Sequence, residues 1–166
     1  MWYDNTVGSR VKKDERAYIA GFLDGDGSLM LQIKKRADTT KGMRLMATIC
    51  LYQDTRHEKN LFWIRKILGI GYITQRNDGM TELRINGFAQ CTRILLDLAP
   101  YIRFKKKQAR ALLSACRLLV RKTLSRLTVG DKERIIDFIL IIQNENYATR
   151  KKRTKQELSQ LFALTP

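Results

Sequence analysis

The sequence predicts an α+β fold, in which one antiparallel four-stranded saddle-shaped sheet carries helices on a single face. Three observations predict it. Helical and strand periodicities follow one another as helix, strand, strand, helix, strand, strand, helix (αββαββα), with further helices at the end. Short polar turns separate the strands of each pair, which is typical of hairpins. Apolar and polar residues alternate along the strands, so one sheet face is apolar and can receive the helices.

The first helix and the first hairpin are predicted from capping and alternation. Asp14 can cap a helix that ends in the glycine-rich segment 25–27. Alternation then predicts strands over 28–36 and 43–52, joined by a polar turn. The two strands have their apolar residues in the same phase, and we therefore expect them to form a hairpin with one apolar face.

The second half of the predicted core repeats this order. Thr55 and Glu58 have the spacing of a capping box and predict a helix that ends before the glycines at 69–71. Strands over 72–76 and 81–86 flank an Asn-Asp-Gly turn, a strong hairpin signal. The following helical stripe is broken by Pro100.

A long amphipathic helix is predicted from about Lys105, with two more helices over 131–147 and 154–164. We expect a single domain over 1–166, composed of an N-terminal arm (1–13), a core (14–125) and C-terminal helices (126–166).

The charge of the chain points to a polyanionic partner. Lys and Arg number 32 and Asp and Glu number 16, which gives a net charge of +16, while 44% of the residues are hydrophobic and can form a core. Nucleic acid is the first expectation and an anionic membrane the second. The most apolar segment, 135–142, is only eight residues long and contains Asp137, so we expect no membrane span. The polar first 15 residues do not resemble a signal peptide, and we expect an intracellular protein that is not secreted.

Cysteine and histidine usage narrows the chemistry. Cys50, Cys91 and Cys116 are odd in number and widely spaced, which favours buried thiols without a disulfide partner. His57 is the only histidine, so one chain cannot supply a histidine-rich metal site. Hydrolytic chemistry would have to rely on carboxylates and hard cations, assisted by Lys, Gln and water.

The polar face of the predicted sheet is a candidate DNA-reading surface. A solvated sheet face is the simpler interpretation, but long hydrogen-bonding or cationic side chains come from all four strands and favour nucleic-acid recognition. The candidate DNA-binding residues are Gln32, Lys34, Arg36, Arg44, Tyr52, Thr74, Arg76 and Arg84.

Segment 19–28 carries the strongest chemical signal. Ala20 and Gly21 thin one side of the first helix, so another backbone can approach it closely. Asp24 and Asp26 follow near the helix C-terminus, where the helix dipole is already negative and a divalent cation would relieve the conflict. From physical reasoning alone, two interpretations stay open: a cation site, or an ordinary helix end with two solvated aspartates.

This segment resembles the motif that defines the LAGLIDADG homing endonucleases. The nine residues 19–27, Ile-Ala-Gly-Phe-Leu-Asp-Gly-Asp-Gly, match the motif with conservative changes only. The similarity extends over about residues 14–125 and includes Gln53 at the end of the second strand, the segment 69–72 and the segment 100–109.

The resemblance implies roles for individual residues. Asp26 matches the metal-binding aspartate of the family, and the carbonyl of Gly25 would also face the metal. Asp26, Gln53 and Lys105 are the implied catalytic residues, the last two by ordering water around the attacking hydroxide, with Lys107 as a possible assistant. One departure stands out: His57 occupies a position where close relatives often have an arginine, and the neighbouring Arg56 is a candidate substitute.

A single motif implies that two chains act together. One globule of this size covers about a dozen base pairs, so the implied target, a roughly palindromic duplex of roughly 20 base pairs cut on both strands, needs a homodimer. Pairing of the motif helices would place the two Asp26 carboxylates side by side. The resemblance implies Mg²⁺ or Mn²⁺ as cofactor, with Ca²⁺ supporting binding without cleavage, and an organelle or the prokaryotic cytoplasm as location. The expected dimer interface consists of Ile19, Ala20, Gly21, Leu23 and Asp24.

Two other interpretations stay open. A non-cleaving binder on the same scaffold, such as an intron RNA maturase or a DNA-binding regulator, would tolerate loss of the catalytic residues, which are all present. An unrelated carboxylate-and-lysine nuclease finds only a poor match in Asp78 and the segment 82–84. We further expect sequence-independent phosphate contacts from basic residues near the C-terminus: Arg121, Lys122, Arg126, Arg150, Lys151, Lys152, Arg153 and Lys155.

Overall fold

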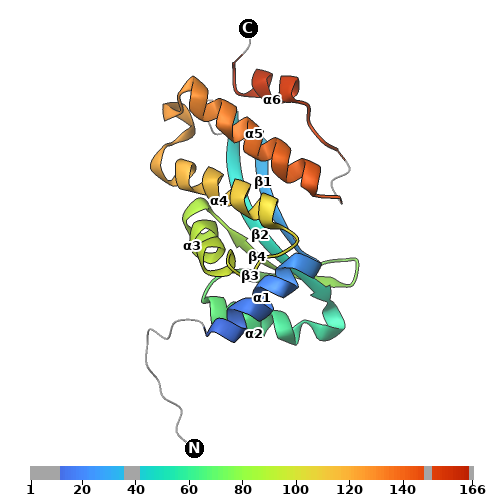
Figure 1. Cartoon of the computed structure of the whole chain (residues 1–166). Helices are drawn as coiled ribbons and strands as arrows, with labels where there is room; N and C mark the ends of the chain where they lie inside the picture. Colours follow the sequence, from blue (N-terminus) through green and yellow to red (C-terminus); the bar gives the residue numbers. More distant parts are fainter. Residues whose placement is uncertain (1–11, 36–41, 148–150, 165–166) are drawn as a thin grey trace, which may run out of the picture.

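The computed structural model describes residues 12–35, 42–147 and 151–164, and the predicted order of elements is confirmed (Figure 1). Arg36 and Arg150, two of the basic residues singled out above, lie outside the described residues. The elements are α1 (Lys13–Asp26), β1 (Gly27–Lys35), β2 (Met43–Asp54), the 3-10 turn η1 (Thr55–His57), α2 (Lys59–Leu68), β3 (Tyr72–Gln75), β4 (Met80–Asn86), α3 (Phe88–Leu98), α4 (Lys106–Arg121), the 3-10 turn η2 (Leu124–Arg126), α5 (Val129–Glu145) and α6 (Lys155–Leu161).

The four strands form one antiparallel sheet in the order β1-β2-β4-β3, as the alternation predicted. Ile49 of β2 pairs with Leu29 of β1 on one side and with Ile85 of β4 on the other. All three side chains are fully buried, because this register puts the apolar residues of the three strands on the same face.

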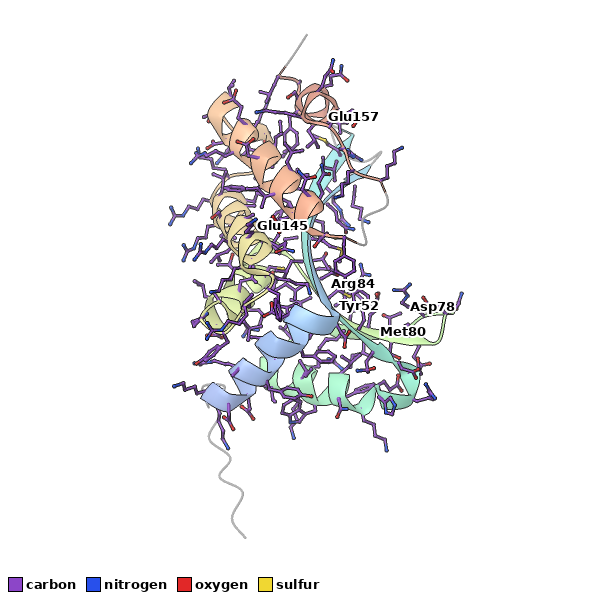
Figure 2. The ribbon with its side chains drawn as sticks, turned by 45° about the vertical axis from the view of Figure 1, so that its right-hand side comes forward. Tyr52, Asp78, Met80, Arg84, Glu145 and Glu157 are labelled. Atoms are coloured by element: carbon purple, nitrogen blue, oxygen red, sulfur yellow. The ribbon has the colours of Figure 1, made fainter. Side chains whose placement is uncertain are left out.

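The helices cover that apolar face and leave the other face open. Figure 2 shows the helices gathered on one side, with Tyr52 and Arg84 of the sheet and the β3–β4 hairpin on the other. Ile19 of α1, Leu95 of α3 and Leu112 of α4 are fully buried in the core between the helices and the sheet. The α+β architecture with a one-sided helical layer is therefore confirmed.

The chain passes from α1 into β1 without a connecting loop. A Cβ atom at Gly27 would lie 2.7 Å from the Leu23 carbonyl oxygen, so the position requires glycine. The helix ends at Asp26, inside the predicted segment 25–27, but it begins at Lys13 with Lys12 at the N-cap, so the predicted cap at Asp14 is wrong. The Asp26 side chain therefore leaves the last turn of a helix, directly before the edge strand β1.

The predicted capping box of Thr55 and Glu58 is wrong. Asp54 caps the 3-10 turn instead, because its carboxylate accepts a 2.8 Å hydrogen bond from the Arg56 N–H. Glu58 accepts hydrogen bonds from the Gln75 amide at 3.0 Å and from the Thr81 hydroxyl at 2.8 Å. The glutamate thus connects the start of α2 to the second hairpin, a tertiary contact that outcompetes the local cap.

The C-terminal helices carry two capping boxes. The predicted box of Thr154 and Glu157 is confirmed, and a second one, formed by Thr128 and Asp131, begins α5. The three cysteines are free and buried, as predicted. Within the described segments, no helix combines the length and the apolar character that a membrane span requires.

Candidate active site

Asp24, although part of the motif, serves as a structural anchor for the loop that precedes α4. Its carboxylate accepts hydrogen bonds from the backbone N–H groups of Arg103 at 2.6 Å, Phe104 at 3.2 Å and Lys105 at 3.0 Å. Only 8% of Asp24 is exposed, so its carboxylate replaces water as the hydrogen-bond acceptor of these backbone N–H groups. Asp24 therefore ties the end of α1 to this loop within its own chain.

Lys105 reaches back from the anchored loop to the end of α1. Its ammonium group donates to the carbonyl oxygen of Asp24 and lies 3.5 Å from the carbonyl oxygen of Gly25. A cation at this position complements the negative end of the helix dipole. Burial lowers the pKa of Lys105, while the charges of Asp24 and Asp26 oppose that shift.

An open cleft of about 630 Å³ lies at the end of α1 and brings the three predicted catalytic residues together. Asp26, Gln53 and Lys105 all line it, and so does Gly25, although they come from α1, β2 and the loop before α4. Asp26 is exposed, in contrast to Asp24. The side-chain oxygen of Gln53 accepts a hydrogen bond from the Asp54 N–H at 2.8 Å. The oxygen of the amide is therefore engaged, and its N–H₂ group remains available as a donor.

The residues fit a hard divalent cation with few protein ligands. Asp26 supplies an exposed carboxylate and Gly25 a backbone carbonyl, both oxygen donors of the kind that Mg²⁺ prefers. The described part of the chain contains no group of three or more His, Cys, Asp or Glu residues able to hold a metal by themselves. A site with a single carboxylate suits Mg²⁺, which is usually bound by one or two carboxylates together with water and substrate phosphates.

The open sheet face holds the described candidate DNA-binding residues in two different states. Lys34, Arg44, Thr74 and Arg76 are exposed. Arg84, by contrast, donates two 3.0 Å hydrogen bonds to Glu82, whose side chain is only 10% exposed. Its guanidinium is therefore already paired in the free protein.

Tyr52 and Gln32 are also engaged on this face. The Tyr52 hydroxyl lies 3.1 Å from the Ser28 hydroxyl, and burial raises the pKa of Tyr52, so the phenol is neutral at neutral pH. The Gln32 amide lies 3.7 Å from the Met30 sulfur. Cys50 contacts Glu82 at 3.7 Å, and burial raises the pKa of the thiol to about 11, which keeps it protonated beside the carboxylate.

The expected dimer interface needs correction. Ile19, Ala20 and Leu23 are fully buried in the core of their own chain, and Asp24 is occupied by the loop at 103–105, so these four residues offer no surface to a partner. Of the five, Gly21 alone lies on the exposed side of α1. The exposed face of this helix, here termed the α1 face, consists of Ala17, Tyr18, Gly21 and Gly25.

Two basic residues have structural partners that their sequence position did not reveal. Lys122, expected to contact phosphates, donates to the buried Asp131 at 2.6 Å. Lys107 pairs with Glu145 at 2.9 Å across α4 and α5 and does not line the cleft. The exposed basic residues of this region stay candidates for phosphate contacts: Arg121, Arg126, Lys151, Lys152 and Lys155. The ammonium group of Lys155 lies 3.7 Å from Asp137, and Arg153 is half-buried.

Sequence reasoning missed the contribution of the end of α5. Asn146 and Tyr147 line the cleft, and the Asn146 amide donates to the Leu29 carbonyl at 3.1 Å. The contact spans 117 residues of sequence, and no local pattern signals it.

The comparisons with known proteins agree with this geometry. The family described as LAGLIDADG endonuclease matches residues 19–116. The DNA endonuclease I-CvuI of Chlorella vulgaris is 35% identical over 103 residues, covering 62% of this chain and 64% of that protein. The DNA endonuclease I-CreI of Chlamydomonas reinhardtii is 28% identical over 107 residues, covering 64% and 65%. The matched regions thus span less than two thirds of either relative.

Solved structures show the same fold. The archaeal intron-encoded homing endonuclease I-Vdi141I, complexed with DNA, superposes with a TM-score of 0.77 at 21% identity and covers 92% of this chain and 98% of its own. I-CvuI, in complex with a DNA target in the presence of magnesium, gives 0.75 at 24% identity, covering 92% and 94%. The motif, the cleft at its end and the family match lead to one conclusion: the chain belongs to the LAGLIDADG endonuclease family.

Proposed function

We propose that the chain is a site-specific DNA endonuclease that hydrolyses both strands of a long, roughly palindromic duplex, in the manner of an intron- or intein-encoded homing enzyme. One observation carries the proposal: Asp26, Gly25, Gln53 and Lys105 line one cleft at the edge of the open sheet face. A duplex lying on that face would place its backbone at the cleft, where oxygen ligands, an amide and an ammonium group face it.

Each residue has a chemical task in this proposal. The Asp26 carboxylate and the Gly25 carbonyl would hold Mg²⁺ or Mn²⁺, with Ca²⁺ allowing binding without cleavage. A bound divalent cation would supply Lewis-acid stabilisation of the phosphate and a more acidic water. Gln53 orients the attacking water through its amide N–H₂. The Lys105 ammonium, fixed against the end of α1, stabilises the negative charge that grows on the phosphate.

Sequence recognition is assigned to the exposed cations of the open face. Lys34 and Arg44 lie on paired positions of β1 and β2 and are both exposed, so they can reach base edges in the major groove. Arg84 can do so only after breaking its hydrogen bonds with Glu82. We therefore assign Arg84 to supporting the surface, with base reading left to the exposed residues.

The active unit in this proposal is a homodimer that pairs through the α1 face. Ala17, Gly21 and Gly25 recur along this face at intervals of four residues, and a Cβ atom on either glycine would meet nothing within 4 Å in the single chain. Two such helices can therefore approach closely about a two-fold axis. This pairing would bring the two clefts together, one for each strand of a target of roughly 20 base pairs.

We further propose that the protein acts where its DNA lies, in an organelle or the prokaryotic cytoplasm. Three free, buried cysteines are consistent with a reducing compartment.

A cleavage selection tests the function. A plasmid library that carries randomised duplex inserts is incubated with the protein in Mg²⁺, in Ca²⁺ and in EDTA, and the cut ends are sequenced. We expect double-strand cuts at one roughly palindromic sequence in Mg²⁺ only, with Ca²⁺ supporting retention of the same sequence on a filter. Retention without cleavage in Mg²⁺ would instead indicate a non-cleaving DNA binder. If no sequence is retained and none is cut, the proposal is overturned.

A further inference from the structure

Arg76 lies at the reaction cleft and not on the outlying part of the sheet face. Among the described residues that line the cleft, Arg76 and Lys105 are the two cationic ones. Arg76 comes from the end of the second hairpin, where its N–H donates to the Met80 carbonyl at 2.7 Å, and Met80 lines the cleft as well. The hairpin therefore contributes a cationic residue to the cleft, in addition to Lys105 from the loop before α4.

The Arg76 guanidinium is positioned by Tyr52. Its Cζ atom lies 5.9 Å from the centre of the Tyr52 ring, within cation–π range. The Tyr52 hydroxyl in turn lies 3.1 Å from the Ser28 hydroxyl, two residues beyond Asp26 in the chain. These two contacts connect Arg76 through Tyr52 to Ser28, and so fix its position relative to the end of α1 and to Asp26, the candidate metal ligand.

Arg76 is held weakly enough to change partner. In the free protein it pairs with Asp78 at 2.7 Å, but the two side chains are 45% and 51% exposed. An exposed ion pair contributes little free energy because water and salt screen it. The pair of Arg84 and Glu82 is different, since its side chains are 23% and 10% exposed and share two hydrogen bonds. A phosphate can therefore take over Arg76 far more easily than Arg84.

The two residues considered for the missing family arginine do not fill this place. Arg56 donates two hydrogen bonds to Asp54, at 2.9 and 2.8 Å, and its side chain is 81% exposed. Neither Arg56 nor His57 lines the cleft, although both belong to the described part of the chain. The cleft thus receives its arginine from the β3–β4 hairpin and not from the segment after β2.

We propose that Arg76 is a catalytic residue of this endonuclease, one that leaves Asp78 when DNA binds and donates hydrogen bonds to a non-bridging oxygen of the phosphate that is cleaved. The inference rests on the proposed function. The planar guanidinium of Arg76 can form two parallel hydrogen bonds to a phosphate, whereas the Lys105 ammonium acts as a point charge. The alternative for Arg76 is the role expected from the sequence, namely reading a base.

The test compares Arg76→Ala and Arg76→Lys with Arg56→Ala, a matched arginine that also pairs with a nearby aspartate but lies outside the cleft. The substrate is the duplex that the wild-type protein retains from the randomised library in Ca²⁺. Single-turnover cleavage in Mg²⁺ should fall about 10²-fold or more in Arg76→Ala. Arg76→Lys should be intermediate and Arg56→Ala should stay close to wild type. Affinity in Ca²⁺ should fall by about tenfold in Arg76→Ala, because one charge-assisted phosphate contact is lost, while the preference at each base pair should be unchanged.

A second measurement links the arginine to the cleaved phosphate. Replacing that phosphate by a neutral methylphosphonate removes the charge that Arg76 would bind. The affinity for the duplex in Ca²⁺ should therefore fall in wild type, and the fold loss should be about tenfold smaller in Arg76→Ala, which lacks the guanidinium. Equal losses in both proteins, or an altered base preference in Arg76→Ala, would overturn the inference while leaving the proposed function intact. A wild-type protein that binds but never cleaves would overturn both. If Arg76→Ala does not fold, Arg76→Lys carries the same comparison.

Discussion

Asp24 and Asp26 lie two residues apart at the end of one helix, yet they serve different parts of the molecule. Asp24 is buried and accepts hydrogen bonds from three backbone N–H groups of the loop before α4. Asp26 is exposed and lines the cleft. In a helix, residues i and i+2 point about 200° apart, so one carboxylate faces the interior of the chain and the other faces the cleft. This helix end therefore carries a structural anchor on one side and a carboxylate that lines the cleft on the other.

Replacing Asp26 by Asn should give the largest effect in this comparison. Loss of a charged metal ligand should lower single-turnover cleavage by about 10³-fold or more. The melting temperature should change little, because the side chain is exposed and lines an open cleft. Duplex cleavage and thermal unfolding, measured on the same preparation, check both statements. Wild-type cleavage by Asp26→Asn would refute the assignment.

Replacing Asp24 by Asn should instead act on stability. The amide presents one acceptor oxygen and turns an N–H₂ group toward backbone N–H donors, so at least one donor loses its partner. We expect the free energy of unfolding to fall by about 2–4 kcal/mol, measured by urea denaturation. Cleavage should fall as well, since Lys105 is held by the same loop. Asp26→Asn is the matched control, and equal destabilisation by both substitutions would break the comparison.

The exposed side of the same helix provides a third contrast. Gly21→Leu should leave the single chain folded, because a Cβ atom there meets nothing within 4 Å, but it should raise the dissociation constant of the dimer by about tenfold or more if the α1 faces pack closely. Sedimentation over a concentration series measures this. Gly130→Leu is the control, since that helical glycine is equally unobstructed and lies on α5. An unchanged dimer in Gly21→Leu would rule out the α1 face.

Asp131 extends the comparison with Asp24, because it is also buried but has cationic partners. Lys122 at 2.6 Å, the Thr128 N–H at 3.1 Å and Arg134 at 2.7 Å lower the pKa of Asp131. A lowered pKa contributes stability above the unfolded value of about 3.9 and loses it as the pH falls below that value. Asp131→Asn should therefore lower the melting temperature by a few degrees at pH 7, and the difference should shrink below about pH 4. A difference that is independent of pH would contradict this explanation.

Much of the fold and of the site followed from the sequence. The strand register was predictable because the period-two pattern of residues such as Leu29 and Ile49 fixes which face is buried. The meeting of Asp26, Gln53 and Lys105 in one cleft followed from the resemblance, since the family pattern relates positions far apart in the chain. The exposed side of α1 did not follow, because the small and apolar residues of segment 17–25 lie on both sides of the helix and their pattern does not say which side meets the sheet.

Other contacts depend on partners that local patterns cannot identify. The Thr55 and Glu58 spacing predicted a cap, but Thr81 and Gln75 compete for the Glu58 carboxylate. The sequence predicted that Lys122 and Arg84 are free to contact DNA, but Lys122 pairs with Asp131 and Arg84 pairs with Glu82. The pairing of Arg84 with Glu82 has a recognisable signal, because residues i and i+2 of a strand share one face. The pairing of Lys122 with Asp131 requires the turn between α4 and α5.

The sequence by itself determined the element order, the one-sided sheet, the basic character and the motif with its two aspartates. These properties depend on short-range periodicity and on residue types, which remain the same whatever the rest of the chain does. Only the tertiary structure decided that Asp24 anchors the loop at 103–105, which side of α1 is free, and that Arg76 shares the cleft with Lys105. Those assignments depend on groups up to 81 residues apart reaching one another, and burial, not sequence spacing, selects among the possible partners.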